Sequence, residues 1–347
     1  MRRVKQKRTI VLAMLGGLLG AVSLFSLGTG TVEVPVSALL AMLAKQLGLS
    51  GTELGAYTQE QWAVIWHIRL PRILVGILVG AALGVSGGVM QGVFSNPLAD
   101  PGIIGVSAGA SFGAVVAVSL GLTAASMYYM PILALGGALV SVAVTVSLAS
   151  KNGKIPVMTL LLAGVAVSMF LSAMTSGILT FMNEYRLREF LFWMVGGLDF
   201  RRWEHVFLAA GPVLVGITVL TFLARHLNVL VLGEDEAKAV GMPVVLIRLI
   251  LLFVASLTTA AAVCVSGSIG FVGLVVPHIM RLLLGPEHRT LLPACALAGA
   301  LFLISCDTLG RLVAAPAEIR VGIVTALTGA PYFLFLLRKA QKGGGWS

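Results

Sequence analysis

The sequence predicts an all-α protein that crosses a membrane about ten times as one transmembrane domain, residues 1–347, packed through glycine-rich helix interfaces. Hydrophobic residues make up 58% of the chain and charged residues 11%, whereas charged residues are about a quarter of an ordinary soluble domain. The mean hydropathy is +1.00. Apolar runs of about 18 residues or more are candidates for membrane-spanning helices, and such runs fill this chain.

Ten apolar runs can be counted, and they leave no room for a large soluble domain between them. The eighth run is short and follows the glycine-containing segment 265–273, which predicts a broken or re-entrant helix. Irregular backbone at membrane depth must be buried in protein. The ten runs lie at about 9–28, 71–92, 103–122, 131–149, 156–182, 203–224, 246–265, 270–284, 291–312 and 321–338.

Lys and Arg residues indicate the orientation, because cytoplasmic loops carry an excess of them. If the N-terminus lies in the cytoplasm, the inner segments hold most of the 24 Lys and Arg residues. We therefore expect both termini on the inner side of the membrane. The first run has a basic start, but no A-x-A type cleavage site follows it, so we expect an uncleaved helix. The net charge of +10 suits anionic lipid headgroups, and the basic residues are too scattered for nucleic acid.

The stretch 69–113 carries two rows of glycines at steps of four, separated by the polar sequence NPLADPG. Glycine inside a helix costs about 1 kcal/mol relative to Ala in water, but it is tolerated in a bilayer. A row of glycines on one face lets a second helix approach closely. The stretch therefore predicts two tightly packed membrane helices joined by a structured polar turn. The glycines expected at packing interfaces are Gly76, Gly80, Gly84, Gly88, Gly92, Gly105, Gly109 and Gly113.

Two longer segments are expected on the outer side. Segment 30–65 predicts a short helix near 36–47, with Ser37 as its cap. Segment 183–202 predicts an amphipathic helix at the membrane edge, either a surface helix with an aromatic anchor or a mobile lid over a pathway mouth. Its apolar positions at helical spacing are Leu187, Phe190, Leu191 and Met194.

The third long segment, 225–247, is expected on the cytoplasmic side. Glu234, Asp235 and Glu236 begin a short helix there, since acidic residues favour the positive end of a helix dipole. Gly241 and Pro243 are expected to end it. A compact exposed helix of this kind is suited to docking a partner.

The chain lacks the sequence features of several other classes. It has no G-x-x-x-x-G-K-[ST] phosphate loop, so ATP binding by that route is not expected. Ion-coupled carriers usually keep ionisable groups near the midplane, and here only Asp100, in the turn after the second run, and Asp307, near the outer end of the ninth, are candidates. An ion-driven transporter and an intramembrane enzyme are therefore the weaker alternatives. We expect no catalytic residue, metal site or cofactor. Cys264, Cys295 and Cys306 lack metal-ligand spacing and are expected to be small buried side chains.

Five separated motifs resemble the FecCD family of ABC-importer permeases, which carry iron–siderophores, haem and cobalamin through the inner membrane. The first joins R-x-P-R and the glycine rows to QGVFSNPLADPGIIGVSAGA. The motifs begin at Arg69, Leu161 (LLAGVA), Leu232 (LGEDEAKAVG), Gly267 (GSIGFVGLVVPHIMR) and Pro316 (PAEIRVGIVTALTGAPYF).

The resemblance implies an assembly of two permease subunits, favoured here as a homodimer, with a cytoplasmic ABC ATPase dimer and an extracytoplasmic substrate-binding protein. It implies that Arg69, Arg72 and Arg311 contact acidic residues of the binding protein. The alternative for Arg69 and Arg72 is snorkelling to lipid headgroups. Arg320 stands where the family commonly has an apolar residue. It is expected to contact either the binding protein or an anionic ligand, and the sequence does not decide between them.

The resemblance also implies roles for residues on the cytoplasmic side. The segment 228–245 is similar to the family's coupling helices, which sit in a cleft of the ATPase subunit. The coupling residues are Leu232, Gly233, Glu234, Asp235, Ala237 and Gly241. The inner gate is expected at Pro156, Val157, Met158 and Thr159, and the fifth and tenth helices are expected to line the pathway. Weakly polar residues of the fifth run add Ser168, Met169, Ser172, Met174 and Thr175.

The resemblance therefore implies the membrane subunit, in a bacterial or archaeal cytoplasmic membrane, of an importer driven by ATP on a separate ATPase subunit. An iron–siderophore or haem is the slightly preferred cargo, because these are the commoner ones in the family. Cobalamin or another corrinoid is the alternative, since all the motifs are shared.

Overall fold

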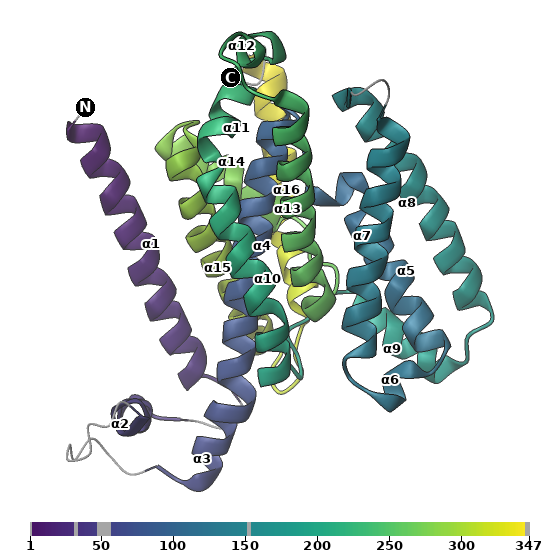
Figure 1. Cartoon of the computed structure of the whole chain (residues 1–347). Coiled ribbons are helices and arrows are strands. Elements are labelled where there is room, and N and C mark those ends of the chain that lie inside the picture. Colours follow the sequence, from purple (N-terminus) through teal and green to yellow (C-terminus); the bar gives the residue numbers. More distant parts are fainter. Residues whose placement is uncertain (1, 31–33, 47–56, 151–153, 344–347) are drawn as a thin grey trace.

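The computed structural model describes residues 2–30, 34–46, 57–150 and 154–343, and among these residues all regular structure is helical (Figure 1). The helices are α1 (Arg2–Gly28), α2 (Val36–Gln46), α3 (Gln59–Ala63), the π-helical η1 (Val64–Arg69), α4 (Leu70–Val93), the 3₁₀ turn η2 (Pro101–Ile104), α5 (Val106–Ser119), α6 (Leu122–Ala125), α7 (Tyr129–Ala149), α8 (Val157–Thr180), α9 (Glu184–Met194), α10 (Trp203–Phe222), α11 (Ala224–Leu230), α12 (Glu234–Ala239), α13 (Val244–Ser266), α14 (Val272–Leu284), α15 (His288–Val313) and α16 (Val321–Gly343).

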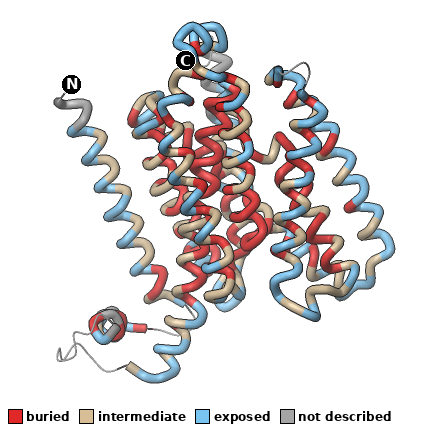
Figure 2. The backbone as a smooth tube through the Cα atoms, viewed as in Figure 1, coloured by how far each residue is buried: buried red, intermediate tan, exposed pale blue. Residues whose placement is uncertain are grey.

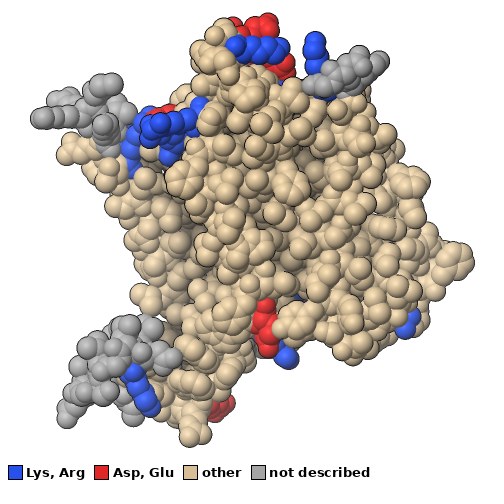
Figure 3. All heavy atoms as spheres, in the orientation of Figure 1, with Lys and Arg blue, Asp and Glu red and all other residues tan. Residues whose placement is uncertain are grey.

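Every predicted apolar run coincides with a helix. Seven helical stretches are long and apolar enough to cross a membrane: α1, the continuous run from α3 through α4, α7, α8, α10, α13 and α15. Three shorter apolar helices, α5, α14 and α16, account for the remaining runs. Figure 3 shows that the visible charged side chains gather at the two ends of the molecule and leave an uncharged belt between them. The fold class is confirmed, and the number of ten crossings stays a prediction.

Helix α4 forms the centre of the larger helix group. It packs against α15, α13, α10 and α14, and its residues are buried along most of its length (Figure 2). A second group, α5, α7, α8 and α9, lies on one side of this centre and joins it through α13. Helix α1 lies on the opposite side, against α15, and is largely exposed. An exposed apolar helix of this kind suits contact with lipid.

The two glycine rows pack tightly, as predicted, but their partners are other helices. On α4, a methyl group at Gly80 would clash with the carbonyl oxygen of Gly299 in α15. On α5, a methyl group at Gly109 would clash with the carbonyl oxygen of Gly137 in α7. Small residues allow such close backbone approach. The rows therefore attach α4 to α15 and α5 to α7, where the sequence alone left the partner helix unspecified. A methyl group at each of the other members, Gly76, Gly84, Gly88, Gly92, Gly105 and Gly113, would also meet atoms of a neighbouring helix or loop.

The turn between α4 and α5 is structured by its own polar side chains, as predicted. The Asn96 Oδ1 atom accepts a hydrogen bond from the Leu98 amide at 2.9 Å. The Asp100 Oδ1 atom accepts one from the Gly102 amide at 2.7 Å and so caps η2. Gly105 then has a positive φ of 91°, which favours glycine.

The predicted break before the eighth run is also present. Helix α13 ends at Ser266 and α14 begins at Val272, and Gly267 between them has a φ of 72°. The Ser266 carbonyl accepts a hydrogen bond from the Gly197 amide at 2.8 Å. Backbone groups freed by the break thus find partners inside the protein, as a membrane environment requires.

One local prediction is wrong. Ser37 lies inside the first turn of α2, which begins at Val36, so it does not occupy the cap position. The predicted amphipathic helix is α9, on which Phe190 and Trp193 are buried. Leu191 and Met194 are exposed, which is compatible with a helix at the membrane edge.

We expect Gly80→Ala to destabilise the protein by about 1–3 kcal/mol, the range for an added group in a close-packed interior. The methyl group would force α4 and α15 apart at Gly299. The matched control is Gly211→Ala in α10, where an added methyl group meets nothing within 4 Å and helix propensity improves. Unfolding midpoints of the detergent-solubilised variants measure the difference, and equal midpoints would contradict the packing argument.

Candidate functional site

The short helix α12 is a compact structure folded onto the inner end of the bundle. Gly233 precedes it with φ 138° and Gly241 follows it with φ 80°. The amides of Gly241 and Met242 donate to the carbonyls of Lys238 and Ala237 at 2.9 and 3.0 Å. This pair of bonds is a Schellman ending, for which glycine is favoured. The predicted start at Glu234 and the ending at Gly241 are both confirmed.

One side of α12 is attached to the chain and the other is open. Ala237 is fully buried against the chain, and α12 packs on α11 and α13. The Asp235 side chain is 98% exposed, and Leu232 and Val240 are exposed apolar side chains on either side of the helix. Val240 was not among the residues that the motif singled out. An exposed surface that combines apolar and acidic groups suits protein docking.

The acidic start of α12 is tied to α13 by an ion pair. Glu234 Oε1 lies 2.6 Å from Arg248 Nη2, and Lys238 Nζ lies 3.6 Å from Glu234 Oε2. The hydrogen bond from Arg248 is the main reason why the pKa of Glu234 lies below its ordinary value. A carboxylate with a lowered pKa contributes stability above its ordinary pKa and loses it as pH falls through the lowered one. The Glu234 carboxylate is therefore ionised at neutral pH.

The predicted gate residues begin α8, directly after the buried residue Ile155. Pro156 occupies the position before the first turn. Met158 is 68% exposed, and the face that it begins continues through Met169 and Phe170. Among the pathway candidates of α8, Thr175 is buried, so it does not belong to this open face.

The predicted outer arginines lie inside a buried polar network. Arg72 Nη2 lies 2.8 Å from Asp307 Oδ1, and its Nη1 lies 2.7 Å from Glu318 Oε2. Asp199 approaches the same guanidinium at 3.2 Å. A buried cation needs such partners, because an unpaired charge away from water is very costly. The network joins α4, α15 and the loops before α10 and α16.

Arg69 and Arg311 are buried beside this network. Arg69 donates to the Leu27 carbonyl at 2.6 Å, and Arg311 donates to the Thr29 carbonyl at 3.0 Å and to the Ser26 hydroxyl. Arg69, Arg72 and Arg311 are each less than a tenth exposed. Their partners in this structure belong to the chain itself, and their contact with a binding protein stays a prediction.

Arg320, whose role the sequence left open, fastens α9 to the start of α16. It donates to the Phe192 carbonyl, and its guanidinium lies 4.5 Å from the centre of the Phe192 ring. Asp199 is 3.7 Å away. With Phe190 and Trp193 buried, these contacts hold α9 against the bundle, which favours an anchored surface helix over a free lid.

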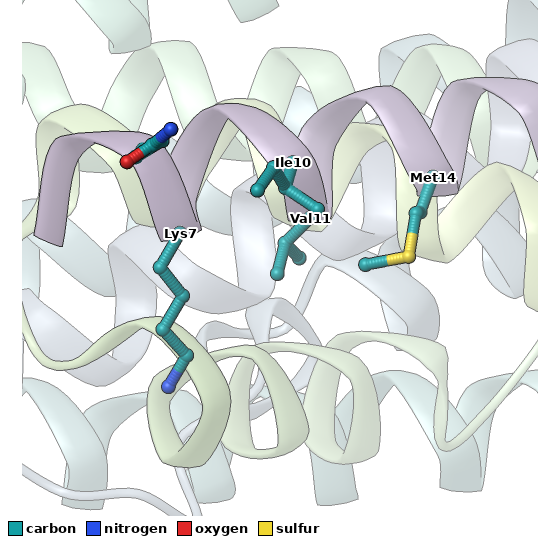
Figure 4. Close-up of a pocket in the computed structure, with 5 residues that line it drawn as sticks. Lys7, Ile10, Val11 and Met14 are labelled. Carbon is teal, nitrogen blue, oxygen red and sulfur yellow. The ribbon is translucent and has the colours of Figure 1, made fainter. Parts of the chain in front are cut away.

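Other features of the described residues suggest no separate site. No group of three or more His, Cys, Asp or Glu side chains in the described part of the chain could hold a metal ion. The three cysteines are buried and free, as predicted. A hollow of about 370 Å³ along α1 is lined by Gln6, Lys7, Ile10, Val11 and Met14, four of which are labelled in Figure 4. Its lining is mostly apolar and open, as expected of a lipid-facing groove.

Comparison with known proteins shows the family to which the chain belongs. The family model of the FecCD transport family matches residues 18–339. The chain belongs to the FecCD transport family. It is thus the permease component of an ABC importer, a class in which the ATPase is a separate subunit.

Individual relatives in this family cover most of the chain. It is 44% identical to the cobalamin import system permease protein BtuC of Halobacterium salinarum, over 80% of this chain and 74% of the relative. It is 38% identical to the ABC transporter permease protein YvrB of Bacillus subtilis, over 92% and 91%. A solved structure described as an inward-facing ABC transporter of metal-chelate type matches with a TM-score of 0.84 and 33% identity, over 95% of this chain and 99% of that one.

We expect Asp307→Asn to destabilise this FecCD-family protein by about 3 kcal/mol, because it removes the main partner of a buried arginine. Removing one partner of a buried charge typically costs about 3–5 kcal/mol. Glu318 and Asp199 remain near Arg72 and keep the loss at the low end of this range. The control is Glu184→Gln, which removes the exposed ion pair with Arg188 and is expected to change stability by less than about 0.5 kcal/mol. Denaturant unfolding in detergent provides the comparison, and equal losses would mean that the outer network carries little stability.

Proposed function

We propose that two copies of this chain form the translocation pathway of an ATP-driven importer that carries cobalamin or a related corrinoid into the cell. The observation that carries the proposal is α12. It places the family's coupling motif on an exposed helix, with its docking side open and its other side fixed to the bundle. Such a helix can receive the movement of an ATPase subunit without unfolding.

The identity of the cargo rests on the relatives. Permeases that are 44% and 41% identical to this chain are named for cobalamin or vitamin B12 import. The sequence alone slightly preferred an iron–siderophore or haem, and that preference is not confirmed. An iron chelate remains the second candidate, because the similar solved structure is described as metal-chelate type.

The proposed assembly contains a cytoplasmic ABC ATPase dimer, an extracytoplasmic substrate-binding protein and a second permease subunit in the cytoplasmic membrane. A second copy of this chain is proposed as that subunit. The exposed face of α8, which begins at Met158, suits the pathway at the axis between two copies. The termini would lie on the cytoplasmic side, the same end as α12.

The alternative of an ion-driven carrier has weak support in the structure. Asp307 is already paired with Arg72 and Arg311 near the predicted outer end. An ion relay needs ionisable groups along the pathway that can change their state. The exposed face of α8 presents apolar and hydroxyl side chains instead.

We expect proteoliposomes that contain this chain with its cognate ATPase and binding protein to accumulate cobalamin only when ATP is supplied. The chain alone is expected to move nothing uphill, because it has no energy source of its own. Uptake of labelled cobalamin, an iron–siderophore and haem, measured in parallel, identifies the cargo. Uphill uptake by the chain alone, driven by an ion gradient, would overturn the proposal.

We expect Asp235→Arg to weaken binding of the ATPase at least tenfold, because it reverses a fully open charge on the proposed docking side. Removing or reversing a charge at an interface changes affinity without needing any change in the permease fold. The control is Glu60→Arg, which reverses an exposed acidic residue in α3 at the opposite end of the molecule (Figure 1). Co-purification and binding titrations with the ATPase measure the effect, and equal affinities for the two variants would place the docking surface elsewhere.

A further inference from the structure

Arg248 joins two segments that the proposed function uses separately. It lies near the start of α13 and is only 4% exposed. Its Nη2 atom lies 2.6 Å from Glu234 Oε1, at the first position of α12. Its Nη1 atom donates to the Ile155 carbonyl oxygen at 3.1 Å, one residue before the proline that precedes α8. One guanidinium therefore connects the docking helix with the beginning of the gate helix.

The geometry of arginine explains why both contacts matter. A guanidinium is planar and presents its donors in a rigid fork, so two acceptors held by one fork are fixed relative to each other. The charge is buried, and removing one partner of a buried charge is strongly unfavourable. Among the residues that the structure describes, the Arg248 Nε atom has no hydrogen-bond partner, so this cation depends on its contacts with Glu234 and the Ile155 carbonyl. Displacement of either partner thus favours displacement of the other.

The backbone at Ile155 is rigid on the side that leads into α8. Ile155 precedes Pro156, and a residue before proline is restricted to extended backbone. Proline itself fixes φ, so a shift of the Ile155 carbonyl passes directly into the first turn of α8. Ile155 also lines a hollow of about 640 Å³ between α7 and α13. The segment therefore has a rigid link toward α8 and free space beside it.

We propose that Arg248 is a positioning residue that transmits movement of α12 to the start of α8 and so opens or closes the inner gate. The inference rests on the proposed function and deepens it by naming the connection between docking and gating. Glu234 supplies the charge that holds Arg248 to α12, and the Ile155 carbonyl receives its second donor. The exposed pair of Glu234 with Lys238 is not part of the connection.

The test uses the complete complex of permease, ATPase and binding protein in proteoliposomes, and its readout is cobalamin transported per ATP hydrolysed. We expect Arg248→Gln to lower this ratio at least tenfold while ATP hydrolysis and ATPase binding persist. Arg248→Lys retains a charge for Glu234 but cannot hold both acceptors in one fork. Its ratio of cobalamin transported to ATP hydrolysed is therefore expected to lie between those of the wild type and Arg248→Gln. Arg289→Gln, at an exposed arginine of the same end, is the matched control and is expected to keep the wild-type ratio.

A double-mutant cycle tests whether Glu234 and Arg248 act as one unit in transport. Glu234→Gln is expected to lower the ratio as well, and the double variant with Arg248→Gln is expected to be no worse than Arg248→Gln alone. Residues that act as one unit show such non-additivity. Additive losses would mean that the two side chains act independently and would overturn the inference.

A spectroscopic readout reports the gate directly. Spin labels at Met158→Cys in two copies give a distance across the proposed pathway, and the native cysteines are buried. ATP binding is expected to change this distance in the otherwise wild-type complex and to leave it unchanged with Arg248→Gln. An equal change in both complexes would overturn the role of Arg248. Failure of the unaltered complex to take up cobalamin or an iron chelate with ATP would instead overturn the proposed function.

Discussion

The close contact of α4 with α15 is the constraint on which the rest of the structure depends. Lipid tails are as apolar as leucine, so membrane helices associate through close packing and polar contacts. Gly80 and Gly299 bring the two backbones together, and this approach fixes both ends of α4. At its outer end Arg72 reaches Asp307. At its inner end Gln91 accepts from Arg281 at 2.8 Å and so fastens α14 to the same helix.

The two ends of the molecule are held in different ways. At the outer end, Arg72, Arg311 and Arg320 share several carboxylates and carbonyls, so that α4, α15, α16 and the loop after α9 form one polar cluster. At the inner end, the described contacts tie α12 to the bundle through one buried alanine and one ion pair, between half-exposed Glu234 and buried Arg248. Regions with few buried contacts open at lower free energy than densely connected ones. Movement is therefore expected to concentrate at the inner end, where the ATPase is proposed to dock, while the outer cluster preserves the arrangement of the spans.

Features encoded locally were predictable from the sequence. The apolar runs, the glycine rows, the break after Ser266 and the limits of α12 each follow from composition, spacing or glycine within a short stretch. The pairing of Arg72 with Asp307 joins residues 235 positions apart, and no local pattern specifies it. On α9, helical periodicity singled out Phe190 but not Trp193, which is also buried, because its neighbours come from segments that a local pattern does not identify. Arg248 could have been noticed as a charge within an apolar run, but both of its partners come from other segments.

The distribution of chemistry along the chain also explains why the cargo was harder to infer than the class of transporter. The motifs that identify the family lie at helix contacts and in turns, where they serve packing, and on α12, where coupling is proposed. The exposed face of α8, proposed to line the pathway, offers Met158, Met169 and Phe170, which supply contact area without charge or a fixed hydrogen-bond pattern. A pathway lined in this way would let a large chelate pass without holding it tightly, since strong recognition would slow release. Selection of the cargo then belongs chiefly to the proposed binding protein, and permeases with similar motifs can serve different chelates.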